Sequence, residues 1–172
     1  ISRIEAGHFE LESIPLDLHD LVERAAELLA TRASAKGIEL MCYVHPDVPH
    51  HVLGDPTRLR QVLINLVGNA VKFTERGEVT LQIEPARGQN NPCAIRFSVS
   101  DTGIGIPADK IQTIFENFSQ VDSSTTRNYG GSGLGLSMVY GFAKQSGGHV
   151  KIYSEVGHGT TVRLYLRRAD DG

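Results

Sequence analysis

The stretch "NLVGNAVKFT", Asn65–Thr74, has the apolar spacing of a helix but an unusual choice of polar residues. Two asparagines and a glycine interrupt it, and such residues cost several tenths to about 1 kcal/mol each relative to alanine. On a helical wheel of about 100° per residue, the expected core face is Leu59, Leu63, Leu66, Ala70 and Phe73. A second apolar flank comprises Ile64, Val67 and Val71. The remaining side, called the polar stripe below, comprises Arg58, Gln61, Asn65, Gly68, Asn69 and Lys72.

A solvated helix face is the ordinary explanation of such a stripe, but it is most stable when built from Glu, Lys, Gln and Arg. Asparagine instead offers an amide oxygen, a hard neutral ligand that suits Mg²⁺. Lys72 follows Asn69 by one turn and offers a point charge for phosphate, while Gly68 permits close approach. The polar stripe therefore predicts a helix that lines a metal–phosphate site.

Outward from this stretch, the pattern predicts a mixed sheet with three helices, which is a two-layer α/β sandwich. The first helix is expected to have Asp17 as its N-cap and to run to about Lys36, ended by Gly37. The second begins with Asp55-Pro56, since aspartate suits the N-cap and proline the first helical position. The third covers about 134–146, and the expected strands lie within 8–18, 38–44, 77–85, 93–100, 149–154 and 160–166.

Two glycine-rich segments suggest where a ligand approaches the backbone. In "SDTGIGIP", residues 100–107, Asp101 is expected at a strand end, and the glycines would admit a flat ligand, although a plain turn is the alternative. "GGSGLGLS", residues 130–137, would precede the third helix and leave free N–H groups for an anion. Neither segment is a GxxxxGK[ST] loop or a GxGxxG motif, which disfavours a dinucleotide-binding oxidoreductase. The aperiodic segment of about thirty residues between them is typical of a lid, a binding loop or disorder.

Composition indicates an ordinary globular domain. The 172 residues carry a net charge of −3 from 17 basic and 20 acidic residues, which gives no reason to expect nucleic acid or an anionic membrane as partner. Cys42 and Cys93 do not form a CxxC pair, so a reducing compartment is expected. No apolar run reaches the roughly 20 residues of a membrane span. Because the chain begins at Ile1, we expect a fragment of a longer protein.

Four blocks lie in the order found in the ATP-binding domains of sensor histidine kinases, and the chain resembles that family over nearly its whole length. They are "NLVGNAVKFT" (65–74, similar to the N box), "DTGIGIP" (101–107, the G1 box), "IFENFSQ" (114–120, the F box) and "GGSGLGLS" (130–137, the G2 box), with "GHGTTV" (157–162) after them. The resemblance implies a Bergerat-type (GHKL) two-layer α/β sandwich: a mixed, mostly antiparallel sheet, covered on one face by three helices, with a long ATP lid. It also implies a catalytic domain over 9–168, a linker remnant of the dimerisation hairpin over 1–8, and a tail over 169–172.

The family pattern also implies roles for individual residues. Asn69 would coordinate Mg²⁺, with Asn65 and Lys72 assisting at the phosphates of ATP. Asp101 would accept a hydrogen bond from the adenine amino group, supported by Thr160. The other residues implied in nucleotide binding are Gly103, Gly105, Ile106, Phe118, Arg127, Gly131, Gly133, Leu134, Gly135 and Leu136.

The function implied is transfer of the γ-phosphoryl group of Mg–ATP to a histidine on a separate dimerisation module, with a response regulator downstream. The fragment is expected to be a cytoplasmic monomer without direct membrane contact, within a homodimeric parent whose membrane anchoring stays open. A regulatory nucleotide-binding module without kinase activity and a Bergerat ATPase that drives a clamp are the alternatives. The intact Asn69, Lys72 and Asp101 disfavour the first, and the F box disfavours the second.

Other candidate residues receive simpler interpretations. His50-His51 has no partner at metal-ligand spacing, so zinc is disfavoured. His19 precedes an acidic residue as a phosphoacceptor histidine does, but no proline follows at the family's spacing, so a surface histidine is expected. Met41 and Tyr43 are expected in the core.

Overall fold

The structure is a computed structural model that describes residues 12–88, 91–107, 109–110 and 130–166. The expected linker remnant, the C-terminal tail, and the lid up to residue 129 lie outside the described residues, as do Phe118 and Arg127. Among the described residues, no helix is long and apolar enough to cross a membrane.

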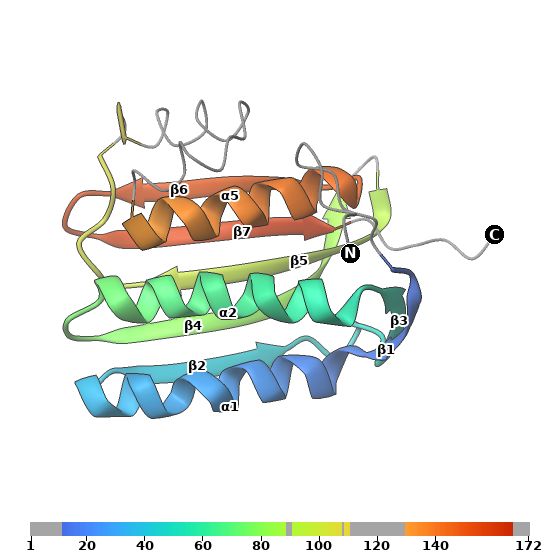
Figure 1. Ribbon diagram of the computed structural model, residues 1–172, viewed down its shortest axis with the longest axis horizontal. Coiled ribbons are helices and arrows are strands. Elements are labelled where there is room, and N and C mark those ends of the chain that lie inside the picture. The colour runs from blue at the N-terminus through green and yellow to red at the C-terminus, as the bar shows by residue number, and fades with distance from the viewer. Residues whose placement is uncertain (1–11, 89–90, 108, 111–129, 167–172) are drawn as a thin grey trace.

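A five-stranded sheet with helices on one face forms the body of the protein, as expected (Figure 1). Its strand order is β2 (Glu39–Val44), β4 (Glu78–Gly88), β5 (Asn91–Asp101), β7 (Gly159–Leu166) and β6 (His149–Glu155). β2 runs parallel to β4, and the other neighbours are antiparallel. The helices lie side by side over the sheet and are α1 (Leu18–Lys36), α2 (Pro56–Phe73) and α5 (Gly130–Gln145).

A separate two-stranded sheet pairs β1 (Ile14–Asp17) with β3 (His51–Gly54) in antiparallel register. Sequence analysis placed a strand within 8–18 but missed β3. The reason is that β3 has only four residues and its pairing partner lies before α1, so no local pattern indicates it.

The helix ends follow the expected capping chemistry. The Asp17 carboxylate accepts a hydrogen bond from the Asp20 N–H at 3.0 Å, and Gly37 ends α1 with φ of 75°. Asp55 caps α2 by accepting from the Arg58 N–H at 3.0 Å. At the other end of α2, the Lys36 ammonium donates to the Val71 carbonyl at 2.8 Å and so satisfies one of its terminal acceptors.

The core lies between the sheet and the helices, and it includes most of the predicted core face and flank of α2: Leu59, Leu63, Leu66, Val67, Ala70 and Val71 are buried. Three side chains expected in the core are partly exposed instead: Met41 (37%), Tyr43 (48%) and Phe73 (37%). Met41 and Tyr43 alternate with Leu40 and Val44, which pack against the core, so they lie on the sheet face that no described helix covers. Phe73 is the last residue of α2 and borders the site described next.

The third helix begins four residues earlier than predicted, at Gly130 rather than Leu134. The glycine-rich segment therefore forms the first two turns of α5 instead of preceding it. Glycine lowers helix propensity by about 1 kcal/mol, which motivated the later start, but propensity is a weak preference that tertiary packing overrides. Further along α5, Val139 and Ala143 are fully buried, and the helix packs against α2.

Candidate functional site

The site is organised around Asp101, the last residue of β5. The β5–β7 register places Asp101 opposite Thr160. One carboxylate oxygen, Oδ1, accepts hydrogen bonds from the Gly103 N–H at 2.9 Å and the Thr160 N–H at 3.2 Å. The other oxygen, Oδ2, makes no hydrogen bond within the described part of the chain. The backbone thus fixes the carboxylate and leaves it one acceptor for a ligand.

Burial raises the pKa of the Asp101 carboxyl above its ordinary value, and the hydrogen bonds from Gly103 and Thr160 act against that rise. The net direction shows that desolvation outweighs the two backbone donors. A ligand that donates to Oδ2 would offset part of this desolvation, because hydrogen bonding to the charged form of a carboxyl favours that form.

Glycines hold the loop after β5 close to its neighbours. A Cβ at Gly103 would collide with the Phe73 carbonyl oxygen and lie 3.0 Å from the Thr74 hydroxyl and 3.1 Å from Asp101 Oδ1. Gly105 has φ of +80°, and a Cβ there would collide with the Glu155 carbonyl oxygen. The loop therefore sits between the carboxyl end of α2 and the β6–β7 turn, and larger residues would push it away.

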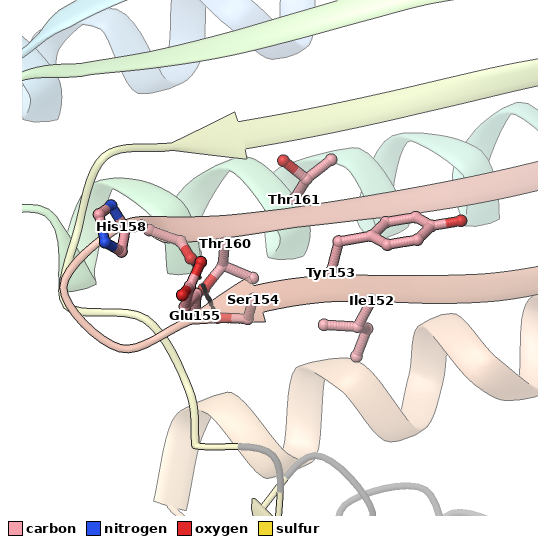
Figure 2. A pocket seen from close by; sticks show the side chains of 8 residues that line it. Ile152, Tyr153, Ser154, Glu155, His158, Thr160 and Thr161 are labelled. Atoms are coloured by element: carbon pink, nitrogen blue, oxygen red, sulfur yellow. Dashed lines mark hydrogen bonds between the residues drawn. The ribbon is translucent and has the colours of Figure 1, made fainter.

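Ser154 joins this loop to the hairpin, a role that sequence reasoning missed. Its hydroxyl oxygen accepts from the Ile106 N–H at 2.7 Å. The same oxygen lies 2.8 Å from the Thr160 hydroxyl and 3.0 Å from the Gly159 carbonyl (Figure 2). Ser154 and Thr160 are register partners across β6 and β7. The only sequence signal was that Ser154 shares a strand face with Val150, which packs against the core, and with the half-buried Ile152.

A hollow of about 520 Å³ lies at this end of the β6–β7 hairpin. Ser154, Glu155, His158 and Thr160 line it, and Figure 2 shows their side chains gathered near the turn. Thr160, which lines the hollow, also donates its N–H to the Asp101 carboxylate, whereas all the residues that line the hollow belong to the β6–β7 hairpin.

The carboxyl-terminal half of α2 brings the polar stripe to the same region. Asn65 is half-buried and its amide N–H donates to the Met138 sulfur at 3.6 Å, which leaves its carbonyl oxygen as an acceptor. Asn69 is also half-buried, whereas Lys72 is exposed, with its ammonium 5.4 Å from the centre of the Phe73 ring. The partly exposed Phe73 ring is thus a second feature of the site that was missed, because it was assigned to the core.

Thr74 follows α2 directly and is completely buried, yet its hydroxyl has no hydrogen-bond partner among the described residues. Buried hydroxyls are almost always satisfied, by protein or by ordered water. Because a Cβ at Gly103 would lie 3.0 Å from this hydroxyl and 3.1 Å from Asp101 Oδ1, the hydroxyl borders the loop after β5, where it could bind a water or a polar ligand atom.

The structure thus brings together the predicted residues of α2, β5, β7 and the loop that contains Gly103, Gly105 and Ile106. The predicted residues Gly131, Gly133, Leu134, Gly135 and Leu136 all fall in the first two turns of α5. The first four N–H groups of a helix have no intrahelical acceptor, so this end of α5 suits an anion. The described parts of the site therefore offer a carboxylate acceptor, amide oxygens, an ammonium and a helix N-terminus.

Comparisons with known proteins place these features in a family. A family model described as "Histidine kinase-, DNA gyrase B-, and HSP90-like ATPase" matches residues 54–170. Signal transduction histidine-protein kinase BarA of Escherichia coli (strain K12) is 41% identical over 165 residues, which is 96% of this chain and 18% of BarA. Sensor histidine kinase GacS of Pseudomonas protegens is 40% identical, again over 96% of this chain and 18% of the relative.

Solved structures of histidine kinases have a similar fold. Full-length ShkA in complex with AMPPNP superposes with a TM-score of 0.78 at 38% identity, covering 95% of this chain and 33% of ShkA. The nucleotide-free catalytic domain of histidine kinase ThkA superposes with a TM-score of 0.72 at 23% identity, covering 91% of this chain and 96% of that domain, which supports the fold alone. This chain therefore spans only 18% of the length of BarA and GacS.

Proposed function

Because the chain belongs to the histidine kinase-, DNA gyrase B- and HSP90-like ATPase family, we propose that it is the ATP-binding catalytic domain of a two-component sensor histidine kinase. The observation that carries the proposal is the Asp101 carboxylate, fixed through Oδ1 by two backbone N–H groups in a glycine-lined loop. Relatives named as histidine kinases match over nearly the whole chain, which supports the kinase over other members of the family.

Asp101 is proposed to recognise the adenine base through a hydrogen bond. An ionised carboxylate only accepts hydrogen bonds, so Oδ2 suits the adenine amino group, whereas guanine would present a carbonyl oxygen to it. Leaving such buried acceptors unpaired costs about 1–3 kcal/mol. Thr160 holds the carboxylate from β7, and the unsatisfied Thr74 hydroxyl supports a further polar contact, directly or through water. The partly exposed Phe73 ring would supply an apolar surface at the edge of the base.

The phosphates are proposed to lie between α2 and the start of α5. Asn69 would hold Mg²⁺, because a neutral amide oxygen is among its suitable ligands, and Asn65, half-buried on the same helix face, would assist at the phosphates. Lys72 would place its ammonium near a phosphate. Mg²⁺, when bound, neutralises phosphate charge, so the chain's own contribution is positioning and electrostatic stabilisation.

The reaction proposed is transfer of the γ-phosphoryl group to a histidine on the dimerisation module of the parent kinase. That histidine would then pass the phosphoryl group to a response regulator. Within the described residues, no histidine has an acceptor-like setting: His19 lies in α1, next to the β1–β3 sheet. An ATPase that drives a clamp is the remaining alternative, and it predicts steady ATP hydrolysis without a histidine substrate.

Incubation with γ-labelled ATP distinguishes these functions. The chain alone should stay unlabelled, and a separately supplied dimerisation module of its parent should acquire acid-labile label slowly, because docking lacks the effective concentration that a tether provides. Asn69→Ala should abolish the transfer. Acid-labile label on the chain itself, removed by His19→Gln, would contradict the proposed location of the acceptor, and steady hydrolysis without the module would favour the clamp ATPase.

A further inference from the structure

A cluster of histidines and an aspartate lies at the start of α1, away from the site around Asp101. Asp17 caps α1, His19 lies in its first turn, and His50 immediately precedes β3. Figure 1 shows β1 and β3 beside this end of α1. The backbone fixes the arrangement, because the Leu18 N–H donates to the His50 carbonyl at 2.7 Å and Asp17 is the register partner of His51.

The side chains of the cluster come close enough to share a ligand. The imidazole rings of His19 and His50 stack with centroids 3.7 Å apart and planes 8° from parallel. One ligand atom from each of Asp17, His19 and His50 can be chosen so that all three lie within 4.8 Å of one another. Sequence analysis had disfavoured zinc because His50-His51 lacked a partner, and folding supplies that partner from a distant segment.

Two of these groups have an uncommitted atom. Asp17 uses Oδ1 to cap α1, which leaves Oδ2 for a ligand. Asp17 is exposed, and an exposed aspartate side chain is a carboxylate at neutral pH. His19 Nδ1 is buried and has no hydrogen-bond partner among the described residues, which is rare for a buried polar atom.

We infer that Asp17, His19 and His50 form a binding site for one divalent transition-metal ion of the zinc type. Two imidazole nitrogens and one carboxylate oxygen are a usual ligand set for Zn²⁺, and a fourth position would remain for water or for the neighbouring His51. Mg²⁺ and Ca²⁺ prefer all-oxygen sites, so this site would discriminate against the metal proposed to accompany ATP.

Binding requires a small rearrangement that the structure permits. In a tetrahedral site with bonds of about 2.0–2.1 Å, ligand atoms lie about 3.3 Å apart, so the three groups must draw together and the stacked rings must separate. His50 is exposed and can rotate, whereas Asp17 and His19 are fixed at the start of α1. The positive end of the helix dipole opposes a cation there, so the three ligands must outweigh it. The bound ion would link the first turn of α1 to the start of β3.

Calorimetric titration of the nucleotide-free, metal-free chain with Zn²⁺, in buffer containing excess Mg²⁺, tests the inference. One equivalent of Zn²⁺ should bind, and His19→Gln and His50→Gln should each weaken binding by about tenfold or more, the scale expected even for groups around a metal site. His149→Gln is the matched control, because His149 stacks on Tyr165 in the main sheet, and it should leave the affinity unchanged. Absence of saturable binding, or equal affinity in His50→Gln, would overturn the inference.

A second measurement on the unmodified protein guards against variants that fail to fold. Histidine ring signals followed by NMR during the Zn²⁺ titration should shift for His19 and His50 and stay unchanged for His149. Shifts of similar size at all three histidines would mean unspecific binding and would also overturn the inference. Neither experiment depends on the ATP site, so the two proposals can fail separately.

Discussion

The hydroxyl oxygens of Ser154 and Thr160 lie 2.8 Å apart across the β6–β7 hairpin, and the same Ser154 oxygen accepts the Ile106 N–H at 2.7 Å. The residue that supports Asp101 from β7 is therefore connected to the loop after β5 through one serine. A matching pair exists on the opposite face of the sheet, where the hydroxyls of Ser100 and Thr161 lie 3.0 Å apart.

Ser154→Ala should weaken ATP binding more than it destabilises the fold. The substitution leaves the Ile106 N–H and the Thr160 hydroxyl without their shared partner, and a hydrogen bond contributes about 1 kcal/mol, so we expect about a five-fold rise in the Kd for ATP. Ser100→Ala removes the equivalent contact on the open face and should leave ATP affinity unchanged. Calorimetry on both variants checks this, and equal effects on Kd would refute the positioning role of Ser154.

Gly103→Ala should abolish ATP binding and lower the Tm, because the added Cβ collides with the backbone carbonyl of Phe73 and crowds Asp101. Gly141→Ala is a suitable control, since a Cβ at that position of α5 would have no atom of another described segment within 4 Å. Alanine is favoured over glycine in a helix by about 1 kcal/mol, so the control should raise the Tm and bind ATP normally. Normal ATP binding by Gly103→Ala would contradict the close packing described for this loop.

The raised pKa of Asp101 predicts how stability depends on pH. Burial lifts the folded-state pKa above the ordinary value of 3.8, so the folded protein holds this proton more tightly than the unfolded chain does. The stability that Asp101 contributes is present below the unfolded pKa and is lost as pH rises through the folded pKa. Asp101→Asn should therefore unfold at a higher temperature than wild type at neutral pH, with the difference shrinking toward about pH 4. Thermal unfolding across this range would contradict the account if Asp101→Asn were less stable at neutral pH.

Asn69→Ala should remove most of the Mg²⁺ dependence of ATP affinity, since the amide oxygen on the polar stripe is the proposed metal ligand. Titrations with ATP in the presence of Mg²⁺ and of EDTA measure this dependence directly. Gln61→Ala, on an exposed part of the same stripe, should behave as wild type. Equal Mg–ATP affinities in wild type and Asn69→Ala would refute the role of Asn69.

Sequence alone predicted the parts of the fold that local chemistry determines. Asp17 and Asp55 cap α1 and α2 as expected. An N-cap can be predicted from local sequence, because its side chain accepts a hydrogen bond from the N–H only three residues further along the chain. The alternation of apolar and polar residues also predicted the central strands. The resemblance to histidine kinases supplied the assignment of Asp101 and Thr160, and the structure places them as register partners.

The features that were missed depend on contacts between distant segments. Ser154 acquires its role only when β6 pairs with β7 and the loop after β5 folds onto the hairpin. His19 and His50 meet only because β3 pairs with β1 beside α1. Phe73 fitted the apolar period of α2, but the helix ends at that residue, so the ring lies at the edge of the core rather than within it.

Competition between ATP and GTP for the site tests the central claim most directly. With a labelled ATP analogue bound to the wild-type chain, unlabelled ATP should displace it at a concentration at least about fivefold lower than GTP, as a mismatch of about 1–3 kcal/mol at Asp101 Oδ2 requires. Asp101→Asn, whose amide can both donate and accept hydrogen bonds, should bring the displacing concentrations of ATP and GTP closer together. Equal displacement by GTP and ATP from the wild-type protein would contradict the assignment of Asp101 as the residue that reads the base.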